Sequence, residues 1–273
     1  MTTWQRRNYE VPDARLVQAE REIYQQYGDV VSIDAKAKSL IKFGKSAPLV
    51  AGSLATVWTV NAGSEVYVSS NIIDSISSSS TLDNEEIYIE GHTVSGTGFD
   101  QKFTFVKQLV NLNGQTRVAL PIPLARVSVT INNNGSLLQG RVVVYENTAI
   151  VGGIPTDLTK IHNNIPLGFQ ESFKAATTFS DEDYYILTSG FGGVSGKQAS
   201  AADFYLEVRL AGRVFTQKAA ATANSSGSNF NLNLDPAVII PRNADIRVRA
   251  EADSNNAVVF ASFNGYLAKV MRQ

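Results

Sequence analysis

Residues 245–268 show the hydrophobic pattern that recurs along most of the chain. In the first arm, residues 245–253, apolar and charged side chains alternate strictly. Successive side chains of a strand point to opposite faces of a sheet, so this arm is apolar on one side and charged on the other. Asn255 and Asn256 suit a turn, and the arm that follows, residues 257–268, carries apolar residues on both faces. The pattern predicts a half-buried strand paired with a nearly fully buried one.

The same alternation predicts two sets of about eight strands. The first set is predicted at residues 54–60, 65–69, 72–80, 86–91, 103–112, 115–120, 124–131 and 138–146. The second set is predicted at residues 171–179, 184–189, 202–211, 214–223, 230–234 and 237–240, together with the pair at 245–268. Turns such as Asn113-Gly114 favour antiparallel hairpins, and the glycine-rich residues 190–196 are predicted to form a mobile loop.

These strands predict a mainly β protein. It would consist of two jelly-roll-like β-sandwich modules, or of one extended sandwich, preceded by a short α-helical N-terminal arm. The predicted domains are an anchor at residues 1–47, a first sandwich at 48–148, a connection at 149–168 and a second sandwich at 169–273.

The predicted anchor consists of an extended arm, residues 1–12, and two helices. Asp13 is a suitable N-cap for a helix that runs to Gly28, and a second helix is predicted over residues 34–43. We expect the arm to dock either on the chain's own body or on a neighbouring subunit. The lysines of the second helix favour an ordinary solvated face, with an anchor onto an acidic surface as the alternative. The predicted anchor residues are Trp4, Arg6, Arg7, Tyr9, Leu16, Ile23, Tyr27, Leu40 and Phe43.

Composition narrows the classes of partner. Charged residues make up 18% of the chain, below the roughly 25% typical of globular proteins, and Ser, Thr, Asn and Gly fill the difference. A formal net charge of −1 gives no electrostatic reason to expect nucleic-acid binding. No apolar run approaches the roughly 18 residues that span a membrane, and the first residues lack the apolar segment of a signal peptide. Cysteine is absent, so we expect stability to come from packing and association.

Candidate catalytic, metal and cofactor motifs are weak. His92 and His162 are the two histidines, neither lies near a nucleophile motif, and both are expected at the surface or in turns. Two histidines without cysteine do not favour a transition-metal site. The acidic residues 181–183 lack the spacing of a calcium loop, and the glycines at 190–193 lack the lysine and helix of a phosphate loop. We therefore expect neither a cofactor nor an enzymatic activity.

Glycan binding is the alternative function, because exposed aromatic side chains offer a stacking surface. The candidates are Trp58, Tyr88, Tyr184, Tyr185 and Tyr205. Aromatic residues on strands belong more often to a core or to a contact between subunits. A polysaccharide-cleaving enzyme would need two carboxylates facing each other across a cleft, and the sequence assigns no such pair.

An aromatic-bearing arm, short helices and two Ser-, Asn- and Gly-rich β modules follow one another in this chain. The phrases that stand out are IYIEGHTV (87–94), QTRVALPIPLARV (115–127), ADFYLEVRL (202–210), IPRNADIRV (240–248) and GYL (265–267). In these features the chain resembles uncharacterised virion structural proteins of tailed, marine-type bacteriophages. The resemblance implies a virion subunit, either a minor capsid or decoration protein or a component of the neck and tail. It carries over no functional residues.

The resulting hypothesis is a non-enzymatic structural subunit of a bacteriophage virion. It would assemble through its N-terminal arm and the edges of its β-sandwiches. Its partners would be other copies of itself and other virion proteins, without nucleic acid or membrane, and with a glycan as the alternative ligand. The low charge of residues 103–112 and 214–223 fits strand edges that a neighbour covers. The hypothesis predicts that deleting residues 1–47 leaves a folded, soluble body that no longer assembles.

Overall fold

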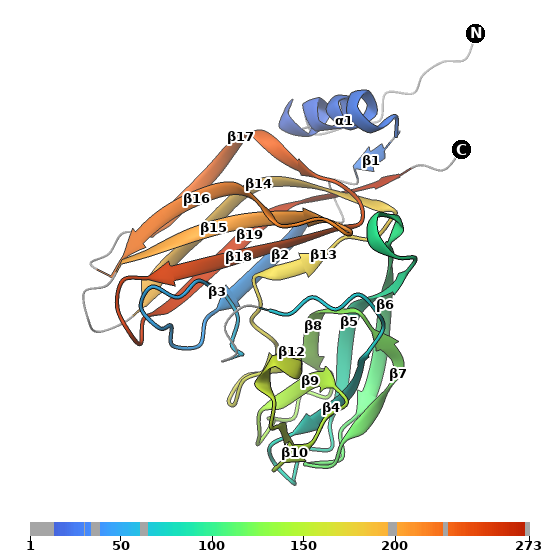
Figure 1. Ribbon diagram of the computed structural model, residues 1–273, viewed down its shortest axis with the longest axis vertical. Helices are drawn as coiled ribbons and strands as arrows, with labels where there is room; N and C mark the ends of the chain where they lie inside the picture. Colours follow the sequence, from blue (N-terminus) through green and yellow to red (C-terminus); the bar gives the residue numbers. More distant parts are fainter. Residues whose placement is uncertain are drawn as a thin grey trace.

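The computed structural model describes residues 14–29, 31–33, 39–60, 65–195, 201–225 and 229–270. Over these residues the chain is mainly β, with several antiparallel sheets and one α-helix near the N-terminus, which confirms the predicted fold class. Figure 1 shows two β bodies, one above the other. We call residues 14–60 and 173–270 the jelly-roll body, and residues 65–172 the inserted body.

The first sheet of the jelly-roll body is built around the long C-terminal strand. In spatial order it contains β2 (Ser39–Lys45) and β1 (Val31–Ile33) end to end, then β19 (Val258–Val270), β14 (Asp183–Ser195) and β17 (Phe230–Ile240). All of these pairings are antiparallel.

The second sheet of this body faces the first across the core. It contains β13 (Ala176–Thr178) and β3 (Ala55–Thr56) end to end, then β18 (Ala244–Ala252), β15 (Ala201–Leu210) and β16 (Thr216–Asn224). Buried residues from both sheets, among them Tyr185, Phe204, Ile246, Val259 and Phe263, form one core cluster between them. The strict alternation in β18 is explained by this position, because Ile246, Val248 and Ala250 face the core.

The strand order of these two sheets is that of a jelly roll. Along the chain the main strands are β2, then β13 to β19. One sheet runs β2-β19-β14-β17 and the other β13-β18-β15-β16, so the first strand pairs with the last and the second with the one before it. This is the arrangement of two Greek keys that defines the fold.

The inserted body is a smaller sandwich that interrupts the jelly roll between β3 and β13. Its sheets contain, in spatial order, β12 (Ile161–Ile165), β9 (Val142–Glu146), β4 (Ile73–Ser78) and β7 (Val118–Leu124), and β6 (Lys102–Asn111), β5 (Glu86–Ser95) and β8 (Arg126–Asn132). A hairpin of β10 (Ile150–Val151) and β11 (Ile154–Pro155) and two 3₁₀ turns, Gly98–Asp100 and Leu158–Lys160, complete it. A separate core cluster, including Ile76, Ile87, Ile89 and Val144, holds its two sheets together.

Helix α1 (Ala14–Tyr27) covers the outer face of the first jelly-roll sheet (Figure 1). Leu16, Ala19 and Ile23 lie on one side of the helix and pack on Tyr184 and Ile186 of β14. Neighbouring residues of β14 face the core instead, so this strand is buried on both faces. The helix ends as predicted at Gly28, whose φ of 71° is the left-handed conformation of a helix C-terminus. Asp13, the predicted N-cap, lies outside the described residues.

Several sequence-based expectations are wrong where the structure can be compared with them. In place of a helix at residues 34–43, β2 occupies residues 39–45, and residues 34–38 lie outside the described part. No strand forms at residues 65–69. The irregular connection contains β12, which pairs with β9 and belongs to the inserted sandwich. Most of the predicted glycine loop, residues 190–195, is the second half of β14.

The predicted domain boundaries therefore differ from the observed bodies. Residues 39–45 are a strand of the jelly-roll sheet rather than part of a detachable anchor. Gly44 fits there because a Cβ at this position would collide with the backbone of Val57 and Ala175. These two residues lie on the segments that enter and leave the inserted body, so β2 is packed tightly against both.

Candidate functional site

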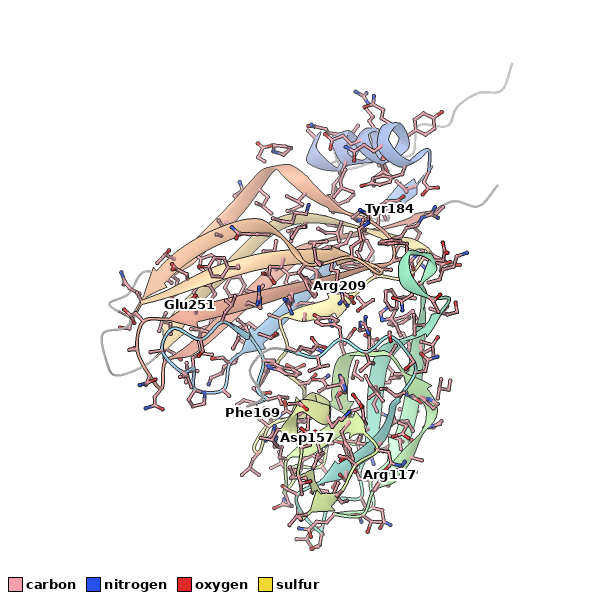
Figure 2. All side chains as sticks on the ribbon, viewed as in Figure 1. Arg117, Asp157, Phe169, Tyr184, Arg209 and Glu251 are labelled. Carbon is pink, nitrogen blue, oxygen red and sulfur yellow. The ribbon has the colours of Figure 1, made fainter. Side chains whose placement is uncertain are left out.

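The predicted anchor residues on helix α1 pack inside the chain's own fold. Leu16 and Ile23 are buried against the first jelly-roll sheet. Tyr27 is 43% exposed and lies with its ring tilted against Tyr184, which Figure 2 shows below the helix. These contacts leave the apolar side of the helix unavailable to a neighbouring subunit in this conformation.

The two predicted anchor residues on β2 are also in contact with the body. Leu40 packs on the jelly-roll core, and its carbonyl oxygen accepts a hydrogen bond of 3.0 Å from the Tyr185 hydroxyl. Phe43, 38% exposed, points to the other face and contacts Phe173 and Phe260. Trp4, Arg6, Arg7 and Tyr9 lie outside the described residues, so their role in assembly stays a prediction.

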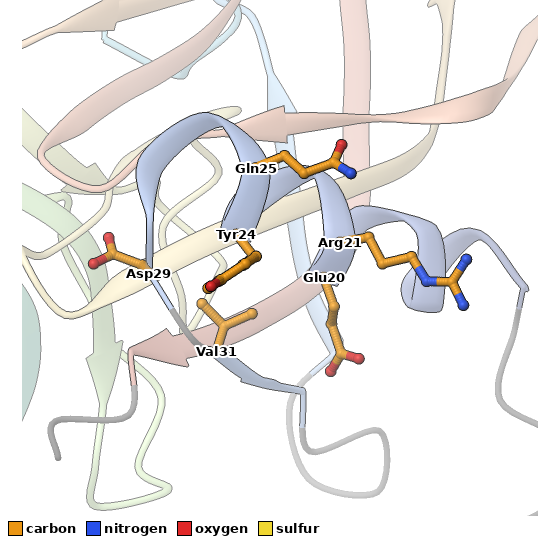
Figure 3. A pocket seen from close by; sticks show the side chains of 6 residues that line it. All are labelled: Glu20, Arg21, Tyr24, Gln25, Asp29 and Val31. Carbon is orange, nitrogen blue, oxygen red and sulfur yellow. The ribbon is translucent and has the colours of Figure 1, made fainter.

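A shallow pocket of about 320 Å³ lies beside helix α1 (Figure 3). It is lined by Glu20, Arg21, Tyr24, Gln25, Asp29 and Val31. Asp29 already has partners here, because it accepts a 2.6 Å hydrogen bond from Tyr184 and lies 3.4 Å from an Arg242 nitrogen. The arrangement fixes the end of the helix to the sheet and offers no buried unpaired group to a ligand.

The five aromatic candidates for glycan stacking divide into two groups. Trp58, Tyr184 and Tyr185 are buried, whereas Tyr88 and Tyr205 are partly exposed. Trp58 packs with Tyr145 and other apolar residues of the inserted body. Three of the five therefore serve packing, as strand aromatics commonly do.

Both histidines are buried, contrary to the expectation that they lie at the surface. His162 Nε2 is 3.0 Å from Glu146 Oε1, and Glu146 also pairs with Lys160 at 2.6 Å. These partners hold the pKa of the Glu146 carboxyl below its usual value, with the hydrogen bond from His162 contributing most. His92 lies on β5, and its Nδ1 atom is buried without a hydrogen-bond partner in the part of the chain that the structure describes. Burial lowers the pKa of His92 to about 3, so its ring is neutral at pH 7.

The two bodies meet through a cluster of buried charges. Asp245 on β18 is completely buried and accepts hydrogen bonds from Arg126 of the inserted body, from Arg209 of β15 and from Thr178 of β13. The Nε atom of Arg126 is 2.9 Å and that of Arg209 3.1 Å from the carboxylate. Figure 2 shows Arg209 close to the junction. One carboxylate thus holds cations from both bodies.

A second buried ion pair lies on the segment where the chain returns to the jelly roll. Lys174 Nζ pairs with Glu65 and donates hydrogen bonds of 2.8 Å to the Val127 carbonyl and 3.0 Å to the His162 carbonyl. All of these groups except the lysine belong to the inserted body. The pair therefore holds the returning chain to the body that it has just left.

A cavity of about 400 Å³, the junction cavity, lies next to these ion pairs and between the two bodies. Its ionisable lining residues are Lys42, Glu90, His92, Lys107, Asp183 and Lys269. Lys107 and Lys269 are more than half exposed and each lies near a carboxylate, 3.4 Å from Glu90 and 3.9 Å from Asp183 respectively. The exposed lysines thus lie where the cavity meets solvent, and Lys42 and His92 lie at its buried end.

The side chain of Lys42 reaches this cavity because successive side chains of β2 point to opposite faces of the sheet. It lies opposite Phe263 of β19, so its side chain is on the core-facing side of the sheet. Only 7% of it is exposed, and its Nζ donates one hydrogen bond of 3.2 Å, to the Ser128 carbonyl. Among the described residues no carboxylate lies within ion-pair distance of this nitrogen. Burial lowers the pKa of Lys42 to about 8, although Glu90 acts in the opposite direction.

The chemistry of the junction cavity favours binding over proton transfer. A general base works best with a pKa near the working pH, and a pKa of about 3 makes His92 a weak one. Lys42 is mainly protonated at pH 7 and presents a poorly compensated positive charge.

Among the described residues there is no cluster of three or more His, Cys, Asp or Glu side chains that could hold a metal ion. In the same part of the chain, no helix has the length and apolar character needed to cross a membrane.

Replacing Lys42 by Met is expected to stabilise the protein at pH 7 by roughly 2–3 kcal/mol, because a desolvated charge is replaced by an apolar side chain of similar length. The pKa of Lys42 is lower in the folded chain (about 8) than in the unfolded chain (10.5), so between these values the unfolded chain binds more protons and wild-type stability rises with pH. The advantage of the variant should therefore shrink from pH 8 to pH 10.5. Urea unfolding of both proteins across this range measures it.

Lys45→Met is the matched control for this prediction. Lys45 is on the same strand, three positions on, and its side chain is on the opposite face. It should change stability little at any pH. A Lys42→Met variant less stable than wild type at pH 7 would show that the buried ammonium is well compensated.

Sequence analysis did not find this cavity. Its lining comes from β2, β5, β6, β8, β13, β14 and β19, which the insertion separates widely along the chain. One local signal was present: Leu40, Lys42 and Gly44 occupy alternate positions, so a strand interpretation of this segment places a lysine on an otherwise apolar face.

Comparisons with known proteins add little to this picture. No protein-family model matches the chain, and no curated protein matches it. Similar solved structures include infectious bursal disease virus Gx strain, with a TM-score of 0.22 and 8% identity over 87% of this chain and 73% of that chain. The Gt strain of this virus has a TM-score of 0.19 and 8% identity, over 89% of this chain and 80% of that chain. The VP2 subviral particle of the same virus has a TM-score of 0.19 and 9% identity, over 87% of this chain and 73% of that chain. At these scores the likeness carries no argument.

Proposed function

We propose that the protein is a non-enzymatic structural subunit of a virus particle, more specifically of a tailed-bacteriophage virion. There it would serve as a minor capsid or decoration protein or as a component of the neck and tail. The observation that carries the proposal is the jelly-roll order of the larger body, an order used by viral capsid domains. Lectin domains share this fold, so the order alone does not choose between them. The resemblance of the sequence to phage structural proteins favours the virion role.

The edges of the sheets support assembly with other subunits. The two long, weakly charged strands that the sequence points to, β6 and β16, both lie at the edge of their sheets. Strand β16 carries one charged residue, Lys218, among nine. Long edges with so little charge pair readily with other chains unless something covers them. In a particle, a neighbouring subunit would supply that cover.

The β6 edge is partly closed within the chain. The Gln108 side chain donates a 3.0 Å hydrogen bond to the Ile122 carbonyl and accepts one of 2.9 Å from the Ile122 N–H. A side-chain amide thus joins β6 to β7 across the edge of the sandwich. This leaves β16 as the better candidate for contacts between subunits.

The test is the copy number of this chain in purified particles from its source, by quantitative mass spectrometry against the major shell protein. Hundreds of copies per particle would support a capsid shell or decoration role, and around a dozen would support a place in the neck or tail. Failure to find the chain in washed particles would contradict the virion role altogether.

A glycan- or receptor-binding module is the second candidate. It is favoured by Phe105, which is 43% exposed and lines the junction cavity, and by the partly exposed Tyr88, which lies on the adjacent strand. A glycan array probed with the full chain, with Phe105→Ala and Tyr88→Ala as variants, tests this function. Binding that both variants retain would rule out this face.

A further inference from the structure

We propose that the junction cavity binds an acidic sugar unit, with the sugar carboxylate on the ammonium group of Lys42. The proposal rests on groups that are buried, polar and incompletely paired, and on the shape of the space between the two bodies. It does not depend on the virion role, because the cavity is formed by a single chain.

The surroundings of Lys42 leave its ammonium group incompletely paired. An ammonium group carries three N–H donors, and the described residues offer this one a single carbonyl acceptor. Burying a charge is costly unless it is paired and hydrogen-bonded. The other buried cations at this junction are paired. Lys174 forms an ion pair with Glu65 and donates hydrogen bonds to two carbonyl oxygens, and Arg126 forms an ion pair with Asp245. A carboxylate entering the cavity would give Lys42 the partner that its neighbours already have.

Polar side chains line the cavity around this lysine. His92 lines the same cavity, and its Nδ1 atom is buried without a hydrogen-bond partner among the described residues. In a neutral imidazole one nitrogen donates and the other accepts, and a hydroxyl group can satisfy either. The side chains of Ser128 and Thr177 also line the cavity, where the Thr177 hydroxyl donates to Ser128 Oγ at 3.1 Å. Hydroxyl-bearing ligands suit such a lining.

The charged and apolar groups of the lining favour a ligand with one negative charge and an apolar face. Glu90 and Asp183 lie beside the two exposed lysines and balance their charges, which leaves the charge of Lys42 unbalanced and matches a ligand with one negative charge. Phe105 and Leu267 offer apolar surface to the carbon face of a sugar ring. A volume of about 400 Å³ lies in the range of small-molecule sites. A singly charged sugar acid meets these conditions better than a phosphate does.

The experiment uses the full chain in solution and glucuronate as the probe, with glucose as its neutral counterpart. The chain has two histidines, so the imidazole signals of His92 and His162 can be followed separately by NMR. We expect glucuronate to shift the His92 signals with a Kd on the order of 1 mM and to leave the His162 signals in place. Lys42→Met should weaken binding about tenfold or more, and Lys45→Met should leave it unchanged.

Other outcomes would overturn the proposal. Glucose binding as tightly as glucuronate would remove the role of the carboxylate, and inorganic phosphate binding more tightly would change the ligand class. An unchanged affinity in Lys42→Met would place the ligand elsewhere. Absence of any His92 shift up to about 20 mM glucuronate would mean that the cavity does not take this class of ligand. The comparison of glucuronate with glucose tests the proposal even without the variants. None of these results bears on whether the chain belongs to a virion.

Discussion

Deletion of residues 1–47 is expected to abolish cooperative folding and leave the remaining chain largely insoluble. The deletion removes helix α1 and strands β1 and β2. Strand β2 is the first strand of the jelly roll and pairs with β19 over residues 260–266. Without it, this pairing between residues more than 200 positions apart is lost, and because β1 is removed as well, β19 becomes an unprotected edge.

Loss of helix α1 adds a second defect. Tyr184 and Ile186 are completely buried, and they would be exposed together with Ala268 on the outer face of the sheet. A contiguous apolar patch of this kind promotes aggregation. The two defects affect the same sheet, so we expect their effects to reinforce each other. Expression, size-exclusion chromatography and thermal unfolding of the truncated chain measure the result.

Deletion of residues 1–12 is the matched control. The helices and strands of the described residues all lie beyond this segment, so the shortened chain should fold and unfold cooperatively as the full chain does. If the arm with Trp4 and Tyr9 is an anchor, this shorter deletion should prevent incorporation into particles without loss of fold. A soluble, monomeric and cooperatively unfolding product of the longer deletion would show that β2 is dispensable.

For the deletion of residues 1–47, sequence and structure give opposite expectations of whether the remaining chain folds. The sequence favoured a helix at residues 34–43, and with it a separable anchor. Leu40, Ile41 and Phe43 fit a helical face, but Leu40, Lys42 and Gly44 also fit one face of a strand. A segment this short is compatible with both periods. The partner that decides between them, β19, lies more than 200 residues further along the chain, and no local pattern reveals it.

The glycines of β14 illustrate a different limit of sequence analysis. Gly190, Gly192 and Gly193 suggested a mobile loop, yet they lie in the middle of a sheet between β17 and β19. A Cβ on Gly192 would lie 2.6 Å from the Phe230 ring and 2.7 Å from the Phe260 carbonyl oxygen. Here glycine makes room for neighbouring strands rather than for motion. A strand glycine and a loop glycine look alike in sequence.

Strongly patterned elements were predictable, and contacts between distant elements were not. The alternation of β18, the long apolar β19 and the amphipathic helix α1 are visible in sequence because each buries one or two continuous faces. The contacts at the junction of the two bodies leave no such pattern in the sequence. Its groups, such as Arg126 and Asp245, look like ordinary exposed charges until the insertion brings them together.

Replacement of Asp245 by Asn is expected to destabilise the protein by about 3–5 kcal/mol, because it leaves two cations in a buried site without their counter-charge. Both guanidinium groups, from Arg126 and Arg209, are bonded to this carboxylate, and the Asp245 side chain is completely buried. For a chain of this size the loss corresponds to a fall in the melting temperature on the order of 10 °C. Because Arg126 belongs to the inserted body, we also expect the two bodies to lose their fixed contact.

The pH dependence gives this prediction a second readout. Burial alone raises the pKa of Asp245, but the charges of Arg126 and Arg209 outweigh it and hold the pKa below its usual value. A carboxyl whose pKa is lowered on folding adds stability above its unfolded pKa, near 3.9, and loses this contribution as the pH falls through the folded value. The gap between wild type and Asp245→Asn should therefore be full at neutral pH and narrow in acid.

Two controls separate the ion network from a general effect of removing a charge. Asp203→Asn removes an exposed carboxylate from the same body, where it accepts a hydrogen bond from Thr222, and should change the melting temperature little. The double variant Asp245→Asn with Arg126→Gln should lose less stability than the two single changes added together, since the groups interact directly. Strict additivity would mean that the carboxylate and the guanidinium do not stabilise each other. In that case the two bodies would be held together by the Lys174 pair and the Trp58 cluster instead.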